Sequence, residues 1–186
     1  MHFPVLTRWP KAWLVGAVLV SMIVAMPVHA ATFEEGQAAA SEGDPARAIF
    51  IWKQLAEAGH AEAQYWLAQT HWGGWWGVPQ DLEQVAKWLT RAAEQGHSPA
   101  LVDLGNMHAE GWHFSQNEAL AAAWFRRAAE AGNTDGQYYL GHLHLQGRGV
   151  PRNAKETLRL WRLAYAGGHE GAGLDLCAEF GESCAD

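Results

Sequence analysis

Cysteine is scarce in this sequence of 186 residues, which contains only Cys177 and Cys184. Their spacing is not the C-x-x-C of thiol–disulfide exchange enzymes, so redox catalysis is not expected. After export the pair is expected to form a disulfide that clamps the C-terminal turn, and closing so short a loop contributes about 2–3 kcal/mol. Two reduced, buried thiols are the alternative.

Positive charge is the second shortage. Lysine and arginine number 13 against 20 aspartates and glutamates, and two of the basic residues, Arg8 and Lys11, belong to the first thirty positions. The remaining chain carries 11 basic and 20 acidic side chains, a net charge of −9 with histidine neutral. That charge argues against a nucleic-acid partner, whose phosphates need a cationic face, and against docking on an anionic membrane.

Catalytic motifs are missing as well. HExxH does not occur, because His169-Glu170 is followed by glycines and no second histidine. The phosphate-binding Gly-Lys-Ser/Thr, Ser-x-x-Lys and Gly-x-Ser-x-Gly are also absent. Because no base, nucleophile and orienting group can be assembled, the sequence predicts a protein that is not an enzyme and holds no cofactor.

A long apolar run occurs only at the N-terminus. A basic start (Arg8, Lys11) precedes an uncharged stretch over residues 12–26, and Val28-His29-Ala30 then offers the small residues that a signal peptidase reads. This run is shorter than the roughly 20 residues needed to span a bilayer. Residues 1–30 are therefore predicted to be a secretory signal peptide cleaved after Ala30, with an uncleaved anchor as the alternative. The mature protein is expected in the periplasm, or secreted, without stable membrane insertion.

The rest of the chain contains an internal repeat. Residues 61–97, 98–133 and 134–169 align with one another, so that Leu104 and Leu140 are 36 positions apart. The first of these units has one additional residue, which falls in a tryptophan-rich turn. Residues 31–60 form a shortened N-terminal unit, and residues 170–186 form a C-terminal capping segment.

Each repeat is predicted to be a pair of helices. In the first full unit Leu82, Val85, Ala86 and Leu89 follow the i, i+3, i+4, i+7 spacing of an amphipathic helix. Glycine-rich turns such as residues 147–150 separate the two helices of a unit, and glycine also follows each second helix. No alternating pattern typical of strands persists, so the predicted fold class is all-α.

These residues resemble the Sel1-like repeats, which are relatives of the tetratricopeptide repeats. The resemblance rests on Ala61-x-Ala63-Gln64-Tyr65-x-Leu67, Gly77-Val78-x-x-Asp81, Trp88-x-x-x-Ala92-Ala93 and Gly96, and on Gln137-Tyr138-x-Leu140-Gly141 with Gly147-x-Gly149-Val150. It covers nearly the whole chain after residue 30. The sequence departs from the family pattern at His71, His108 and His144, where tyrosine is usual, and it lacks the usual lysine early in the second helix.

The resemblance implies a right-handed α/α solenoid that serves as an exported adaptor or scaffold for another protein. A periplasmic immunity or inhibitor protein that neutralises a toxin is an alternative of the same general class. A cell-envelope enzyme acting on β-lactam or peptidoglycan-like substrates is an alternative of a different class, because cysteine-rich relatives have been linked to β-lactams. Fold analogy does not choose among these roles.

Histidine is abundant enough to raise the question of a metal site. His71, His108 and His144 occur once per repeat, so equivalent copies would lie about 10 Å apart, too far for one ion. His142 and His144 point to different sides of a helix. The sequence therefore predicts packed or hydrogen-bonded histidines and no metal.

A protein partner is expected on the concave side of the solenoid, which the first helices of the repeats line. The side chains that vary between repeats and fall outside the packing pattern include Trp66, Gln69, Asp103, Asn106, Tyr139 and His142. Trp66 and Tyr139 are the sharpest candidates, because an aromatic anchor in a groove often dominates an interface. Packing of both rings against the adjacent repeat is the alternative.

The turn Trp72-Gly73-Gly74-Trp75-Trp76 holds more tryptophan than a repeat turn needs. Trp75 and Trp76 are predicted to form a protruding apolar contact for a partner. The alternative is that they fold back over the edge of the stack. In that case their removal would lower stability rather than binding.

Overall fold

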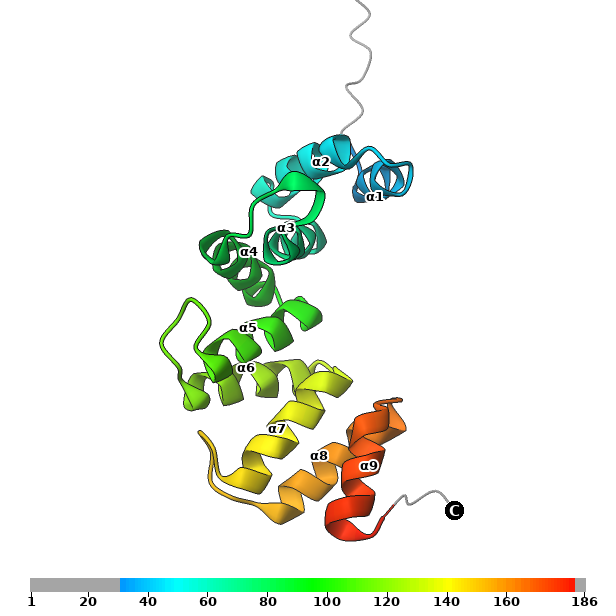
Figure 1. Ribbon diagram of the computed structural model, residues 1–186. Coiled ribbons are helices and arrows are strands. Elements are labelled where there is room, and N and C mark those ends of the chain that lie inside the picture. The colour runs from blue at the N-terminus through cyan, green and yellow to red at the C-terminus, as the bar shows by residue number, and fades with distance from the viewer. Residues whose placement is uncertain (1–30, 183–186) are drawn as a thin grey trace, which may run out of the picture. The chain divides into compact units, whose positions relative to one another are not determined.

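The computed structural model describes residues 31–182, which fold into helices joined by turns (Figure 1). The helices are α1 (Phe33–Ser41), α2 (Pro45–Glu57), α3 (Ala61–Gly73), α4 (Leu82–Glu94), α5 (Ser98–Glu110), α6 (Glu118–Glu130), α7 (Thr134–Gln146), α8 (Ala154–Ala166) and α9 (Glu170–Phe180), with a 3-10 turn, η1 (Trp75–Gly77), after α3. No strand occurs in this range, which confirms the all-α fold class. The expected signal peptide and Cys184 lie outside the described residues, so cleavage and the disulfide stay predictions.

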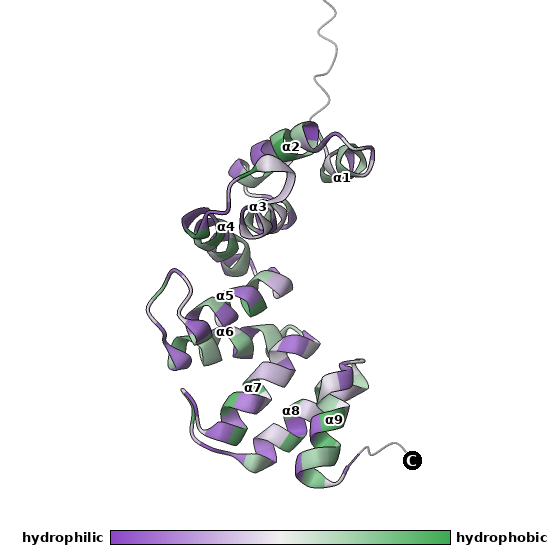
Figure 2. Ribbon diagram, viewed as in Figure 1, coloured by the Kyte–Doolittle hydropathy of each residue, from purple (hydrophilic) through white to green (hydrophobic). Residues whose placement is uncertain are grey.

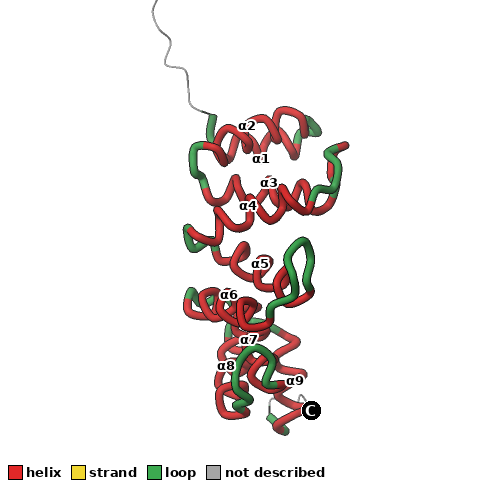
Figure 3. Tube along the Cα trace, turned by 90° about the vertical axis from the view of Figure 1, so that its left-hand side faces the viewer, coloured by secondary structure: helices red, strands yellow, loops and turns green. Residues whose placement is uncertain are grey.

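Consecutive helices pack against one another in chain order, as a repeat stack requires. Each first helix contacts the second helix of its own pair, and that second helix contacts the first helix of the next pair. Figure 3 shows the longer α3–α4 and α5–α6 turns on one edge of the stack and the short turns between pairs on the opposite edge. Each hairpin hides its apolar side only against its neighbours, which is the physical basis of a solenoid.

Polar side chains start every helix of the repeats. Each second helix is preceded by an aspartate or asparagine whose side-chain oxygen accepts a hydrogen bond from a backbone N–H of the first turn. These residues are Asp44, Asp81, Asn117 and Asn153. The first helices α3, α5 and α9 are preceded by His60, His97 and His169. The Nδ1 atom of each histidine accepts a hydrogen bond from a backbone N–H of the first turn at 3.1–3.3 Å. Each cap satisfies a donor that a helix start otherwise leaves unpaired.

The core between the two helices of a pair is built from a small residue facing a large one. A methyl group added at Gly105 of α5 would lie 2.5 Å from the Phe125 ring of α6, and one added at Gly141 of α7 would lie 2.4 Å from the Trp161 ring of α8. One repeat earlier the same two positions hold Ala68 and Leu89. A bulky ring in the second helix is therefore matched by glycine in the first, because interiors pack without spare volume.

The apolar core is continuous along the stack rather than gathered at one centre. A cluster of buried residues runs from α1 to α8, and a smaller cluster of Trp161, Ala164, Ala172 and Leu176 joins α8 to α9. Figure 2 shows hydrophobic and hydrophilic residues side by side on each helix, the pattern expected where every helix has one buried side. Within the described range no helix has the length and apolar character to cross a bilayer.

The turn between α7 and α8, the two helices of the last repeat, depends on a close backbone approach. Gly149 has a φ of +65°, and a methyl group added there would lie 2.2 Å from the carbonyl oxygen of Glu118. Only glycine meets both conditions without strain. This contact presses the α7–α8 turn onto the start of α6, and the same turn carries Arg148, which lines a pocket between α5 and α7.

Candidate partner-binding site

The first helices of successive repeats are joined directly by polar side chains. Asp103 of α5 accepts a hydrogen bond from Nε2 of Gln69 in α3 at 2.6 Å and also accepts one from the Tyr65 hydroxyl. These bonds cross from one repeat to the next. The helices α3, α5, α7 and α9 therefore form one continuous face, which we call the A face. The opposite side, formed by α2, α4, α6 and α8, is the B face.

The same arrangement recurs at the C-terminal end of the A face. Asp175 of α9 accepts a hydrogen bond from the Tyr138 hydroxyl at 2.8 Å, and its Oδ2 lies 2.9 Å from Nε2 of His142 in α7. Tyr138 occupies the position in its repeat that Tyr65 occupies two repeats earlier, and His142 stands where Gln69 does. A tyrosine and a second donor from one repeat thus bind a carboxylate of the next.

The junction between α5 and α7 lacks this arrangement. At the equivalent positions stand Val102 and Asn106 in α5, with Tyr139 in α7 in place of the aspartate. Valine has no donor and tyrosine is no carboxylate, so the two helices are not tied together in the same way. A pocket of about 280 Å³ opens at this junction.

The pocket combines aromatic, amide and charged groups. It is lined by Asn106, Ala109, Glu110, Phe125, Tyr138, Tyr139, His142, Leu143, Gln146 and Arg148. The Tyr139 ring packs against Phe125, with ring centroids 5.2 Å apart, and stands 5.6 Å from the Tyr138 ring. Nε of Arg148 donates to Oε1 of Glu118 at 2.6 Å, so its charge is balanced from outside the pocket.

Burial and nearby carboxylates disfavour ionisation of the tyrosine hydroxyls on the A face. Burial raises the pKa of Tyr65 to about 12, with the nearby Asp103 adding to the effect. Burial and the Asp175 carboxylate likewise raise the pKa of Tyr138 to about 12. The pKa of Tyr139 is raised by burial and by Asp135 and Asp103. The hydroxyls of all three tyrosines therefore stay protonated at neutral pH, and those of Tyr65 and Tyr138 donate to Asp103 and Asp175.

Three of the six A-face residues predicted to face a partner meet at this pocket. Asn106, Tyr139 and His142 all line it. Gln69 and Asp103 lie one junction away and are bonded to each other. Trp66 packs its ring against Trp52 at 5.4 Å and donates from Nε1 to Glu62 at 3.0 Å, which matches the packing alternative. The binding role of these residues stays a prediction.

The tryptophan turn combines both predicted arrangements. Trp75 and Trp76 are 45% and 44% exposed, yet the Trp76 ring lies 5.9 Å from that of Trp52, and Trp75 covers Gly73. Trp76 has a φ of +55°, a conformation that a large side chain adopts only under constraint from its surroundings. The pair therefore covers the edge of the stack and still presents apolar surface to solvent.

The once-per-repeat histidines pack as single residues. The His108 ring is buried and stacks on Phe114 with centroids 4.4 Å apart, and burial lowers its pKa. Nδ1 of His144 lies 3.1 Å from the carbonyl oxygen of Pro151. In the described part of the chain, no three metal-binding side chains converge.

The sequence interpretation missed both roles of the histidines that precede the first helices, the helix cap and an ion pair. Because Nδ1 of His97 accepts from the backbone, its proton is on Nε2, which lies 2.8 Å from the carboxylate of Glu62, at the start of the repeat that His97 closes. His169 pairs in the same way with Asp135 at 3.5 Å. The Gly-His pair that closes three of the four repeats was the available signal. The acidic partner at the start of the same repeat becomes evident only in the structure.

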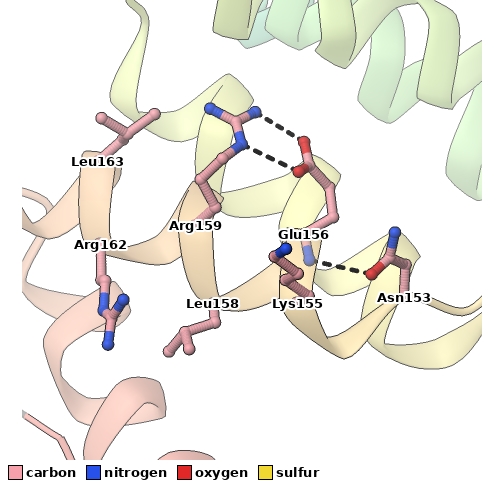
Figure 4. A pocket seen from close by; sticks show the side chains of 7 residues that line it. All are labelled: Asn153, Lys155, Glu156, Leu158, Arg159, Arg162 and Leu163. Carbon is pink, nitrogen blue, oxygen red and sulfur yellow. Dashed lines mark hydrogen bonds and ion pairs between the residues drawn. The ribbon is translucent and has the colours of Figure 1, made fainter.

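A larger cavity lies on the B face along α8 (Figure 4), and its Glu156, Arg159 and Arg162 side chains already form ion pairs. About 550 Å³ in volume, it is lined by Asn153, Lys155, Glu156, Leu158, Arg159, Arg162 and Leu163. Arg159 donates two hydrogen bonds to the Glu156 carboxylate, at 2.9 and 2.6 Å. Nε of Arg162 donates to Glu182 at 2.7 Å. With both arginines held this way, we place the candidate site on the A face instead.

Comparison with known proteins identifies the repeat. The family model described as Sel1 repeat matches residues 30–60, 61–97, 98–133 and 134–169. No curated protein matches the sequence.

Solved structures support the same assignment. A protective antigen of uropathogenic Escherichia coli strains that displays an SLR fold is 33% identical over 70% of this chain, with a TM-score of 0.67; the match spans 28% of that antigen. A Sel1 repeat protein from Oxalobacter formigenes is 32% identical over 71% of this chain and 98% of its own length, also with a TM-score of 0.67. Cysteine-rich protein B of Helicobacter pylori shares the fold at 18% identity and a TM-score of 0.53, over 76% of this chain and 95% of its own.

Proposed function

Because the chain belongs to the Sel1 repeat family, we propose that it is a protein-binding adaptor that holds its partner on the A face, at the pocket between α5 and α7. Proteins built from Sel1 repeats generally mediate protein–protein interaction, and the family is typically a non-enzymatic scaffold. The finer proposal concerns where on this chain the partner sits.

The observation that carries the proposal is the interrupted network. At the α3–α5 and α7–α9 junctions the polar groups of the A face bind one another. At the α5–α7 junction the Asn106 side chain makes no hydrogen bond within the described chain, and the Tyr139 ring packs against the rings of Phe125 and Tyr138. A ring and an amide held at the rim of a pocket match the anchors that dominate protein interfaces.

We also propose that the adaptor works outside the cytoplasm, in the periplasm. The order of basic residues, apolar run and small residues in positions 1–30 supports this location. Intact-mass measurement of the protein recovered from the periplasm tests it. A form beginning at Ala31 is the expected result, and a full-length form retained in the membrane contradicts it.

Site-specific photo-crosslinking in the native cell tests the binding site. A photoreactive residue at Gln146, which is exposed at the pocket, should trap a partner, and Asn106→Arg should abolish the adduct by filling the pocket. Phe50→Ala removes an aromatic ring that is 63% exposed on α2 and serves as the matched B-face control. A crosslink that survives Asn106→Arg, or that is lost with Phe50→Ala, would overturn the proposed site.

A further inference from the structure

The charges of the helices are divided between the two sides of the hairpins. The first helices of the described repeats carry nine acidic residues and no lysine or arginine: Glu34, Glu35, Glu62, Asp103, Glu110, Asp135, Glu170, Asp175 and Glu179. The second helices carry nine basic and six acidic residues. The division therefore follows the two faces of the stack.

Helix dipoles do not explain this division. They favour acids in the first turn and would equally favour lysine or arginine in the last turn. The last turns of α3, α5 and α7 hold only His71, His108 and His144 as basic groups. The second helices, which have the same dipole, do carry arginine near their ends, at Arg91 and Arg127. Another requirement therefore keeps cations off the first helices.

We propose that the A face docks an extended segment of its partner that bears lysine or arginine, with one cationic side chain seated in the pocket between α5 and α7. This inference rests on the proposed adaptor function and names the chemistry of the partner. Charge complementarity of this kind steers encounter and selects the partner.

The pocket has the groups that such a side chain needs. The Tyr139 ring offers a π-face, on which an ammonium or guanidinium group is attracted, and Glu110 supplies a carboxylate at the rim. The side-chain oxygen of Asn106 is available as an acceptor, whereas that of Gln146 accepts a hydrogen bond from Arg148 at 3.3 Å. At about 280 Å³ the space falls just below the usual range of small-molecule sites, and it suits one long side chain better than a cofactor.

The length of the face sets the length of the segment. First helices of neighbouring repeats lie about 10 Å apart, so the path from α3 to α9 spans about 30 Å. An extended chain covers this distance with about nine residues. The carboxylates of Asp103, Asp135 and Asp175 are distributed along that path, on three different helices.

Peptide titration tests the inference with the mature protein. The probes are nine-residue Gly/Ser peptides, acetylated and amidated, that contain three arginines, three lysines, three citrullines or three glutamates. Binding is followed by amide chemical shifts in two-dimensional NMR at 20 and 300 mM NaCl. The arginine and lysine peptides should bind with the largest shifts around Tyr139, at least tenfold more tightly than the citrulline peptide, and several-fold more weakly at the higher salt concentration.

Charge-matched variants separate docking on the A face from general attraction to an acidic protein. Glu110→Gln with Asp135→Asn removes two carboxylates from the A face, and Glu83→Gln with Glu94→Gln removes two from α4 on the B face. The A-face pair of substitutions should lower the affinity for the arginine peptide at least fivefold. The B-face pair should leave this affinity within twofold of the wild-type value. Equal effects of the two pairs, or equal binding of arginine and citrulline peptides, would overturn the inference.

The two proposals fail in different ways. If Asn106→Arg abolishes the crosslink in cells but cationic peptides do not bind, the adaptor stands and the cationic partner is wrong. If no crosslink depends on the A face, the adaptor site itself is wrong, whatever the peptides do.

Discussion

Gly105→Ala provides the sharpest test of how the helices of a repeat pack. The added methyl group would lie 2.5, 2.7 and 3.0 Å from three carbons of the Phe125 ring, and that ring is 2% exposed and enclosed by the core. Overpacking of this kind costs about 1–3 kcal/mol. Replacing glycine by alanine inside a helix returns up to about 1 kcal/mol. We therefore expect Gly105→Ala to lower the free energy of unfolding by about 1–2 kcal/mol.

The compensating change comes from the repeat before it, where Ala68 and Leu89 occupy the equivalent positions. Phe125→Leu alone is destabilising. Combined with Gly105→Ala, it should recover at least half of the unfolding free energy that Gly105→Ala loses. Urea unfolding followed by circular dichroism at 222 nm on all four proteins gives the coupling energy, which should be about 1 kcal/mol or more. If Gly105→Ala is as stable as the wild type, or if the two changes add without coupling, the size-matching argument is wrong.

Three further predictions concern the tyrosines, a capping histidine and the tryptophan turn. Because the pKa values of Tyr65 and Tyr138 are raised to about 12 in the folded protein, their contribution is fully present below pH 10 and is lost as the pH rises toward 12. The contribution of each tyrosine to the free energy of unfolding is about 1 kcal/mol after allowance for solvent screening. In urea unfolding measured between pH 9 and 12, the double variant Tyr65→Phe with Tyr138→Phe should lose less stability with rising pH than the wild type. His97→Ala removes a cap and the contact with Glu62 and should lower the unfolding free energy by about 1 kcal/mol, whereas His97→Asn, which keeps a capping acceptor, should lose less than half as much. Trp76→Gly should be more stable in thermal melts than Trp76→Ala by about 1 kcal/mol, because glycine alone relieves the positive φ; equal stability of the two variants would show that this backbone position is not strained.

The helical fold could be predicted from the sequence because its determinants are local and repeated. Apolar spacing such as Leu82, Val85 and Leu89 defines a helix, and a return of the pattern every 36 residues defines the next hairpin. The pairing of Gly105 with Phe125 was also present in the sequence. It was missed because glycine in a helix is ordinarily unfavourable, and only the position of the opposing ring shows why it is needed.

The site was predicted less completely, because its contacts join different repeats. Variation between repeats singled out Asn106, Tyr139 and His142, and the structure brings them to one pocket. The same criterion also selected Gln69 and Asp103, which vary because they bind each other. A residue that differs between repeats is thus either free for a ligand or bound to a neighbour, and only the register of one helix against the next distinguishes the two.

That register suggests why the pocket lies at the middle of the stack. A solenoid is stabilised by the sum of its repeats and the interfaces between them, and the network around Asp103 and the one around Asp175 each add hydrogen bonds to an interface. The α5–α7 junction gives up these bonds, yet it is flanked by a reinforced junction on either side and by the continuous core beneath. Absence of the hydrogen-bond network at α5–α7 weakens an interface that the adjoining junctions hold in place. Absence of the network at α7–α9 would instead loosen α9, the last described helix. The central junction is therefore the position where polar groups can be left open for a partner at the smallest structural cost.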